Sequence, residues 1–86
     1  MFSATLIVKN KTGLHARPAS QLVEISQKFD SELRIKTENT DVDPKSIISI
    51  LSAGIKQGTV IELTAEGSDE DFAGAELVAL IESFTD

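Results

Sequence analysis

The stretch GLHARPAS at residues 13–20 joins two different patterns of apolar residues. Before it, apolar and polar residues alternate over positions 2–8, which is typical of a half-buried strand. After it, apolar residues follow the three- and four-residue spacing of an amphipathic helix. Gly13 permits the turn, and Pro18 suits the first turn of a helix. The sequence therefore predicts that His15 lies at a helix N-terminus, directly after a strand.

That position predicts a particular chemistry for His15, the single histidine of the chain. The first N–H groups of a helix have no intrahelical partner and carry partial positive charge, so they attract anions. Arg17 adds a planar cation suited to phosphate oxygens. Imidazole is nucleophilic and partly neutral near pH 7. Together these groups predict a place that holds a phosphoryl group on nitrogen. The alternative is a surface histidine without such a role.

Outward from this stretch, the spacing of apolar residues predicts seven elements in the order βαββαβα. We expect strands over residues 2–8, 32–36, 40–43 and 59–66, and helices over residues 16–29, 47–52 and 69–84. The residues expected to face the core are Phe2, Ala4, Leu6, Val8, Ala19, Leu22, Val23, Ser26, Phe29, Ile61, Leu63, Ala65, Ala73, Leu77, Leu80, Ile81 and Phe84. Ser68 is expected to cap the last helix, with acidic residues in its first turn. Gly74 interrupts that helix at a cost of about 1 kcal/mol, and only close packing would explain it.

Alternating strands bury one face of a sheet, and amphipathic helices can cover that face. The pattern therefore predicts an α+β protein, a two-layer open-faced sandwich, within a single domain over residues 1–86. The same element order fits a ferredoxin-like arrangement with an extra helix. The sequence alone leaves the order of the strands open.

Composition excludes several classes of function. The chain has no cysteine and one histidine, so we expect no disulfide, no metal site and no cofactor. Its net charge of −6 argues against nucleic acid and against anionic membranes as partners. It has neither a basic leader at its start nor an apolar run of about 20 residues, so we expect a soluble, cytoplasmic protein.

A second candidate region lies around residues 44–54. Pro44 ends the preceding strand, Ser46 is a natural N-cap and Gly54 a natural helix end. The short helix between them has more apolar residues than one side can bury. We therefore expect Ile47, Ile48 and Leu51 to form an exposed docking patch, the alternative being a fully buried short helix.

Both regions resemble the family of histidine-containing phosphocarrier proteins (HPr) of the bacterial phosphoenolpyruvate:sugar phosphotransferase system. Residues 13–19, GLHARPA, resemble the family's active-site segment, and residues 45–54, KSIISILSAG, resemble its regulatory-serine helix. The likeness extends over the whole chain, including its length and a Gly-Thr pair at residues 58–59. It implies a four-stranded antiparallel sheet with three helices on one face.

The resemblance also implies a function. The chain would accept a phosphoryl group from phosphorylated enzyme I and pass it to sugar-specific enzyme IIA domains, as a monomeric carrier rather than a stand-alone enzyme. His15 would be the nucleophile, phosphorylated on Nδ1. Arg17 would stabilise the transferring group, and the N–H groups of Ala16 and Arg17 would receive its oxygens. Ser46 would be a regulatory serine, phosphorylated by an HPr kinase/phosphorylase and read by a catabolite control protein.

The chain departs from the family pattern at several positions. Ser49 stands where glycine is common, and Ile48 and Leu51 stand where methionine is common. Glu24 lies on the first helix where family members often present basic groups. Arg17, Lys45 and Lys28 are the cations expected near the site.

Three alternatives belong to other classes. An acyl carrier protein would need an almost all-helical chain. A ferredoxin-like binding domain would not need His15 and Arg17 at a helix end. A regulatory HPr paralogue would act mainly through Ser46, and retention of His15 argues against it.

Overall fold

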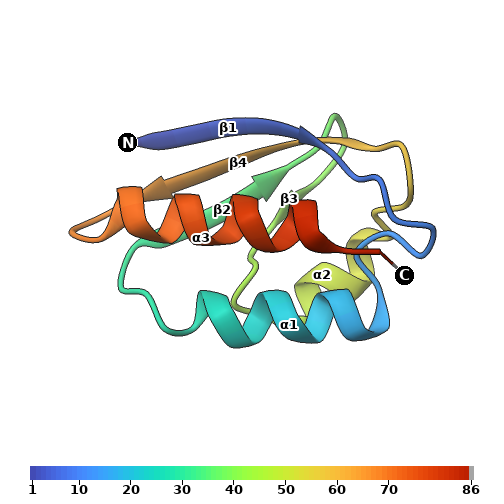
Figure 1. Cartoon of the computed structure of the whole chain (residues 1–86), viewed down its shortest axis with the longest axis horizontal. Coiled ribbons are helices and arrows are strands. Elements are labelled where there is room, and N and C mark those ends of the chain that lie inside the picture. The colour runs from blue at the N-terminus through green and yellow to red at the C-terminus, as the bar shows by residue number, and fades with distance from the viewer. Residues whose placement is uncertain (86) are drawn as a thin grey trace.

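The computed structural model describes residues 1–85 and contains the seven elements in the predicted order. They are β1 (Phe2–Ile7), α1 (Ala16–Ser26), β2 (Glu32–Lys36), β3 (Asp41–Val42), α2 (Ile47–Ala53), β4 (Val60–Glu66) and α3 (Glu70–Ser83). The strands form one antiparallel sheet in the order β1-β4-β2-β3, with Leu6 opposite Ile61 and Ile35 opposite Leu63. All three helices lie on one side of this sheet (Figure 1). The predicted open-faced sandwich is confirmed, and the strand order is now defined.

The core lies between the inner face of the sheet and the helices. In β4, residues 61, 63 and 65 are buried while residues 60, 62 and 66 are exposed, as period-two alternation requires. Most residues expected to face the core are buried, and Phe2, Leu6, Val23, Phe29 and Leu80 are partly buried against it. Sheet and helices therefore share one continuous apolar core.

Helix α1 is shorter than the apolar spacing predicts. It ends at Ser26, and the chain then continues through tighter i→i−3 bonds from Lys28 N to Ile25 O and from Phe29 N to Ser26 O. This narrower turn is a common way to satisfy the last carbonyls of a helix. Phe29 stays partly buried, so the predicted inward face was right and the predicted helix end was wrong.

The start of α3 also differs from expectation. Its N-cap is Asp69 rather than Ser68, and the Asp69 side chain does not cap the helix. Its carboxylate instead accepts hydrogen bonds from the backbone N–H groups of Asp30 and Ser31, at 2.9 and 3.0 Å, and from the Ser31 hydroxyl. The carboxylate thereby ties the start of α3 to the segment between α1 and β2. Glu70 and Asp71 occupy the first turn as expected.

Gly74 is explained by the close approach of α3 to β1. A Cβ atom at this position would lie 2.2 Å from the nearest ring carbon of Phe2. The helix accepts a poor helix former here because any side chain would displace the aromatic ring. Within the part of the chain that the structure describes, no helix is long and apolar enough to span a membrane.

Candidate functional site

His15 is the N-cap residue of α1. Its backbone is extended, with φ −129° and ψ 162°, and its imidazole is exposed. Within residues 1–85 that side chain makes no capping hydrogen bond to the helix. The ring is therefore available to a molecule that approaches from solvent, as the sequence predicts.

The loop before His15 is held by contacts that the sequence did not reveal. Leu14 is buried, and its N–H donates to Ile55 O at 3.0 Å. Gly13 has φ +65°, and a Cβ there would lie 2.3 Å from the same carbonyl oxygen. The side chain of Asn10, itself buried, donates to Gly13 O at 2.8 Å. These contacts fix the backbone that presents His15, and they also join it to the end of α2.

The first turn of α1 contains the backbone N–H groups that the sequence predicts as anion-binding groups. The N–H groups of Ala16 and Arg17 precede the first intrahelical hydrogen bond, and Pro18 has no N–H. No acidic residue lies in this turn, so nothing in it repels a bound phosphate. Ala16 has φ +46°, which is the one positive φ among the non-glycine residues of the described chain. That conformation costs about 1–2 kcal/mol for a residue with a Cβ.

Arg17 is exposed on the same turn. The ion pairs found among residues 1–85 join the N-terminal ammonium to Glu70 and Arg34 to Asp41, so neither involves Arg17. Its guanidinium is therefore not neutralised by a carboxylate of the described chain. It can reach toward an anionic group held beside His15.

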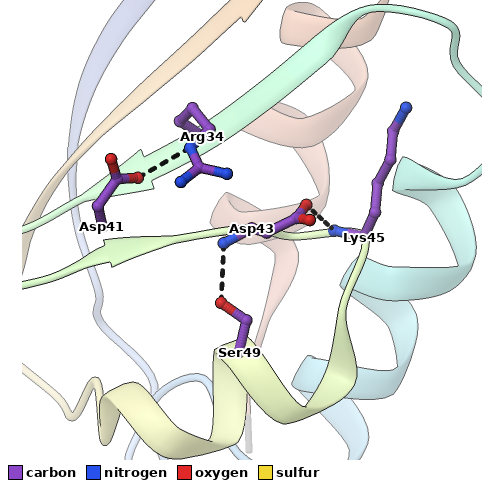
Figure 2. A network of polar contacts seen from close by, with 5 residues as sticks. All are labelled: Arg34, Asp41, Asp43, Lys45 and Ser49. Carbon is purple, nitrogen blue, oxygen red and sulfur yellow. Dashed lines mark hydrogen bonds and ion pairs between the residues drawn. The ribbon is translucent and has the colours of Figure 1, made fainter.

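Ser46 is the N-cap of α2, as predicted, and its Oγ accepts a hydrogen bond from Ser49 N at 3.2 Å. Ser49 in turn accepts from Asp43 N at 2.9 Å through its own Oγ, and the Asp43 carboxylate accepts from Lys45 N (Figure 2). The segment before Ser46 is thus bonded to the helix that follows it. The predicted C-terminal stop, Gly54, has the left-handed φ of +62°.

The three apolar residues of the predicted patch are exposed on α2. Ile48 is 73% exposed, Leu51 40% and Ile47 37%, whereas Ile50 faces the core. The alternative of a fully buried helix is therefore wrong. Since α2 packs against α1 and ends beside the loop that carries His15, the patch adjoins the histidine end of α1.

Two of the cations expected near His15, Lys45 and Lys28, lie toward the opposite end of α1. Lys45 Nζ donates to Phe29 O at 2.8 Å, and Gln27 Nε2 donates to Lys45 O at 3.2 Å. Both contacts lie beyond the C-terminal end of α1, and Lys28 directly follows that end. A helix of 11 residues is about 16 Å long, so Arg17 is the cation that accompanies His15. The terminal carboxylate of Asp86 lies outside the described residues.

Comparison with known proteins gives a consistent result. A family model described as "PTS HPr component phosphorylation site" matches residues 2–83. The chain is 40% identical to phosphocarrier protein HPr of Xylella fastidiosa, over 96% of this chain and 93% of the relative. It is also 44% identical to the HPr-like protein Crh of Halalkalibacterium halodurans, over 87% of this chain and 89% of the relative.

Solved structures agree with this result. The structure of HPr-C-His from Thermoanaerobacter tengcongensis is similar with a TM-score of 0.92 and 49% identity, covering 96% of this chain and 93% of the other. An HPr dimer from the same organism is similar with a TM-score of 0.76 and 49% identity, covering 96% and 95%. The fold and the sequence therefore point to the same family.

Proposed function

The chain belongs to the HPr family of phosphocarrier proteins, and we propose that it relays a phosphoryl group from enzyme I to sugar-specific enzyme IIA domains through His15. One observation carries this proposal. His15 is an exposed N-cap whose ring does not cap its own helix, with Arg17 unpaired beside it among the described residues. A bound phosphoryl group would complete this helix end.

The transfer step needs little from the carrier beyond positioning and charge. A neutral imidazole nitrogen, Nδ1 by family resemblance, attacks phosphorus, and the bond to the donor enzyme breaks as the new N–P bond forms. The N–H groups of Ala16 and Arg17 and the Arg17 guanidinium stabilise charge on the phosphoryl oxygens. The same step in reverse releases the group to the acceptor.

Partner docking is proposed for the patch Ile47, Ile48 and Leu51. Exposed apolar side chains that adjoin a reactive group suit a protein that must bind two partners in turn. We expect the carrier to act as a monomer in the cytoplasm, although a related HPr forms a dimer.

The relay is tested by two-stage transfer. The protein is labelled with radioactive phosphoenolpyruvate and enzyme I, purified from both, and mixed with an enzyme IIA domain. Label should move to the IIA domain, and His15→Ala should never acquire label. Label that stays on the wild-type protein in the presence of several IIA domains would contradict the relay.

Ser46 is proposed as a regulatory site, modified by an HPr kinase/phosphorylase and then recognised by a catabolite control protein. Its half-buried hydroxyl lies at the start of the helix that carries the patch. A phosphate there would place about two negative charges beside Ile47 and Ile48. Docking of enzyme I should therefore weaken.

We predict that Ser46→Asp slows phosphorylation by enzyme I about tenfold, equivalent to 1.4 kcal/mol of lost docking energy. Ser46→Asn is the matched control, because asparagine also caps helices but carries no charge. Initial rates at limiting carrier concentration measure the effect. Equal rates for the two variants would show that charge at this position does not control docking.

A regulatory paralogue acting mainly through Ser46 is the second candidate, favoured by the similarity to the HPr-like protein Crh. Such a protein would be labelled by the ATP-dependent kinase and not by enzyme I. Parallel labelling with both donors separates the two candidates.

A further inference from the structure

The outer face of α3 carries an apolar stripe where a surface helix is normally polar. Its inward residues, Ala73, Gly74, Leu77 and Ile81, are buried. Phe72, Ala75 and Ala79 follow three- and four-residue spacing, so they form one stripe on the opposite side. Phe72 is 67% exposed, and both alanines are exposed. We call Phe72, Ala75, Glu76, Ala79 and Glu82 the α3 outer face.

Charge is distributed very unevenly along the chain. All eight lysines and arginines lie within residues 1–56, whereas residues 57–86 contain eight of the fourteen acidic residues and no basic one. At 100° per residue, Glu76 lies on one side of the stripe and Glu82 on the other. Both are exposed. The apolar stripe is therefore bordered by negative charge on both sides.

The α3 outer face begins far from His15. The Phe72 ring lies 6.2 Å from the ring of Phe29, between centroids, and Phe29 follows the C-terminal end of α1. Helices α1 and α3 run side by side in opposite directions (Figure 1). Phe72 belongs to the first turn of α3 and His15 is the N-cap of α1, so the two residues belong to opposite ends of this helix pair. A molecule bound around Phe72 would leave the His15 end of α1 uncovered.

We propose that the α3 outer face binds a cationic amphipathic helix of a partner protein. Phe72 provides an aromatic anchor of the kind that dominates binding energy, and its ring face also attracts lysine or arginine. The small side chains of Ala75 and Ala79 allow a second helix to approach closely. Glu76 and Glu82 pair with basic residues beside its apolar stripe.

Other occupants fit this surface less well. Anionic lipid and nucleic acid would be repelled by Glu76 and Glu82. A second copy docked α3 against α3 would bring like charges together. The proposal goes beyond the phosphoryl relay, because it adds a second docking surface on α3, a helix that carries neither His15 nor the α2 patch.

The test uses a synthetic helical peptide of leucine and lysine at amphipathic spacing, with a leucine–glutamate peptide as its control. Titration of the isotope-labelled full chain, followed by amide chemical shifts, should move the signals of residues 72–82 with the lysine peptide and leave them unchanged with the glutamate peptide. Shifts centred on α2, or spread evenly over all acidic residues, would overturn the proposal.

Variants separate a specific face from general charge attraction. Phe72→Ala and Glu76→Lys should each weaken binding of the lysine peptide about tenfold, as expected for an anchor and for a bordering charge. Val60→Ala is the matched control, because Val60 is an equally apolar, 54% exposed residue on the outer face of the sheet. Phosphorylation by enzyme I should be unchanged in all three. Unaltered peptide binding by Phe72→Ala, with the fold intact by circular dichroism, would contradict the proposal.

Discussion

Two serines have hydroxyl groups in opposite environments. Ser26 is fully buried, and its Oγ has no hydrogen-bond partner among residues 1–85. Ser49 Oγ accepts a hydrogen bond from the backbone N–H of Asp43, a residue that lies between β3 and α2 and belongs to neither. A buried hydroxyl without a partner lowers stability, whereas loss of a partner for a backbone N–H removes a stabilising bond.

We therefore predict opposite effects of the same substitution. Ser26→Ala should raise the free energy of unfolding by about 1 kcal/mol, since alanine also favours the helix. Ser49→Ala should lower it by about 1–2 kcal/mol. Urea unfolding of both variants beside wild type measures the difference. A loss of stability in Ser26→Ala would mean that its hydroxyl is satisfied, for instance by water.

Local chemistry predicted some residues and not others. His15, Arg17 and Ser46 could be identified because their roles follow from the few residues around them. Asn10 and Ser49 could not be identified, because each holds a loop through a hydrogen bond that exists only in the folded chain. Ser49 in sequence was only a departure from the family pattern, and its partner Asp43 lies across the turn before α2.

Helix α2 carries exposed apolar residues and ends beside the loop that precedes His15. Its position depends on packing against α1, on contacts with β3 and on the hydrogen bond from Leu14 N to Ile55 O. The segment directly after the helix that carries the patch is thus bonded to the loop before His15. A change on the patch should affect partner binding without altering the chemistry of His15.

We predict that Ile48→Lys raises the KM of enzyme I for this carrier about tenfold or more, because a charged residue replaces the most exposed apolar side chain of the patch. The rate at saturating carrier should change little. Val60→Lys, at an exposed apolar position on the sheet, serves as the control and should behave as wild type. A fall in maximal rate with unchanged KM would place the effect in the chemical step instead.

The ends of elements were harder to predict than their existence. The start of α1 was predicted correctly because Gly13 and Pro18 mark it, but its end was not, since the i→i−3 turns after Ser26 keep the same apolar spacing. The N-cap of α3 was misplaced because Asp69 bonds to Ser31 rather than to its own helix. A single sequence does not show whether a side chain such as Asp69 bonds to its own helix or to a residue far away in the chain.

Two carboxylates tie together segments that lie far apart in the chain. The Ser31 hydroxyl and then the Asp30 N–H hold the pKa of Asp69 below its usual value. The N-terminal ammonium and then the Gly67 N–H do the same for the pKa of Glu70. In return, Glu70 raises the pKa of the ammonium group. Each of these shifts favours the charged form in the folded state.

Stability should therefore depend on pH at both ends of the range. The two carboxylates stabilise the fold at any pH above their unfolded-state pKa values. This contribution is lost from about pH 5 downward, as the pH falls through their lower folded-state pKa values. The ammonium group stabilises the fold below pH 8.0, and its contribution is lost as pH rises through its raised pKa. Asp69→Asn should be less stable than wild type near neutrality and should lose less stability on acidification. An identical acid dependence in the variant, measured by urea unfolding, would contradict the role of Asp69.

The overall architecture was predictable from alternation and helical spacing, but the strand order was not. Neighbours β1 and β4 are more than 50 residues apart in the chain, and β4 lies between β1 and β2 in the sheet. Nothing in the individual strands specifies that long-range pairing; the family resemblance implied an antiparallel sheet, and the structure provided its order.

We propose that the ring of His15, at the open N-terminus of α1, accepts the phosphoryl group. The most direct measurement is the chemical stability of the phosphate that enzyme I and phosphoenolpyruvate place on wild type, His15→Ala and Ser46→Ala. We predict a phosphate that is labile in acid and stable in alkali, present on wild type and Ser46→Ala and absent from His15→Ala. A folded wild-type protein that takes no label, or one whose label survives His15→Ala, would contradict it.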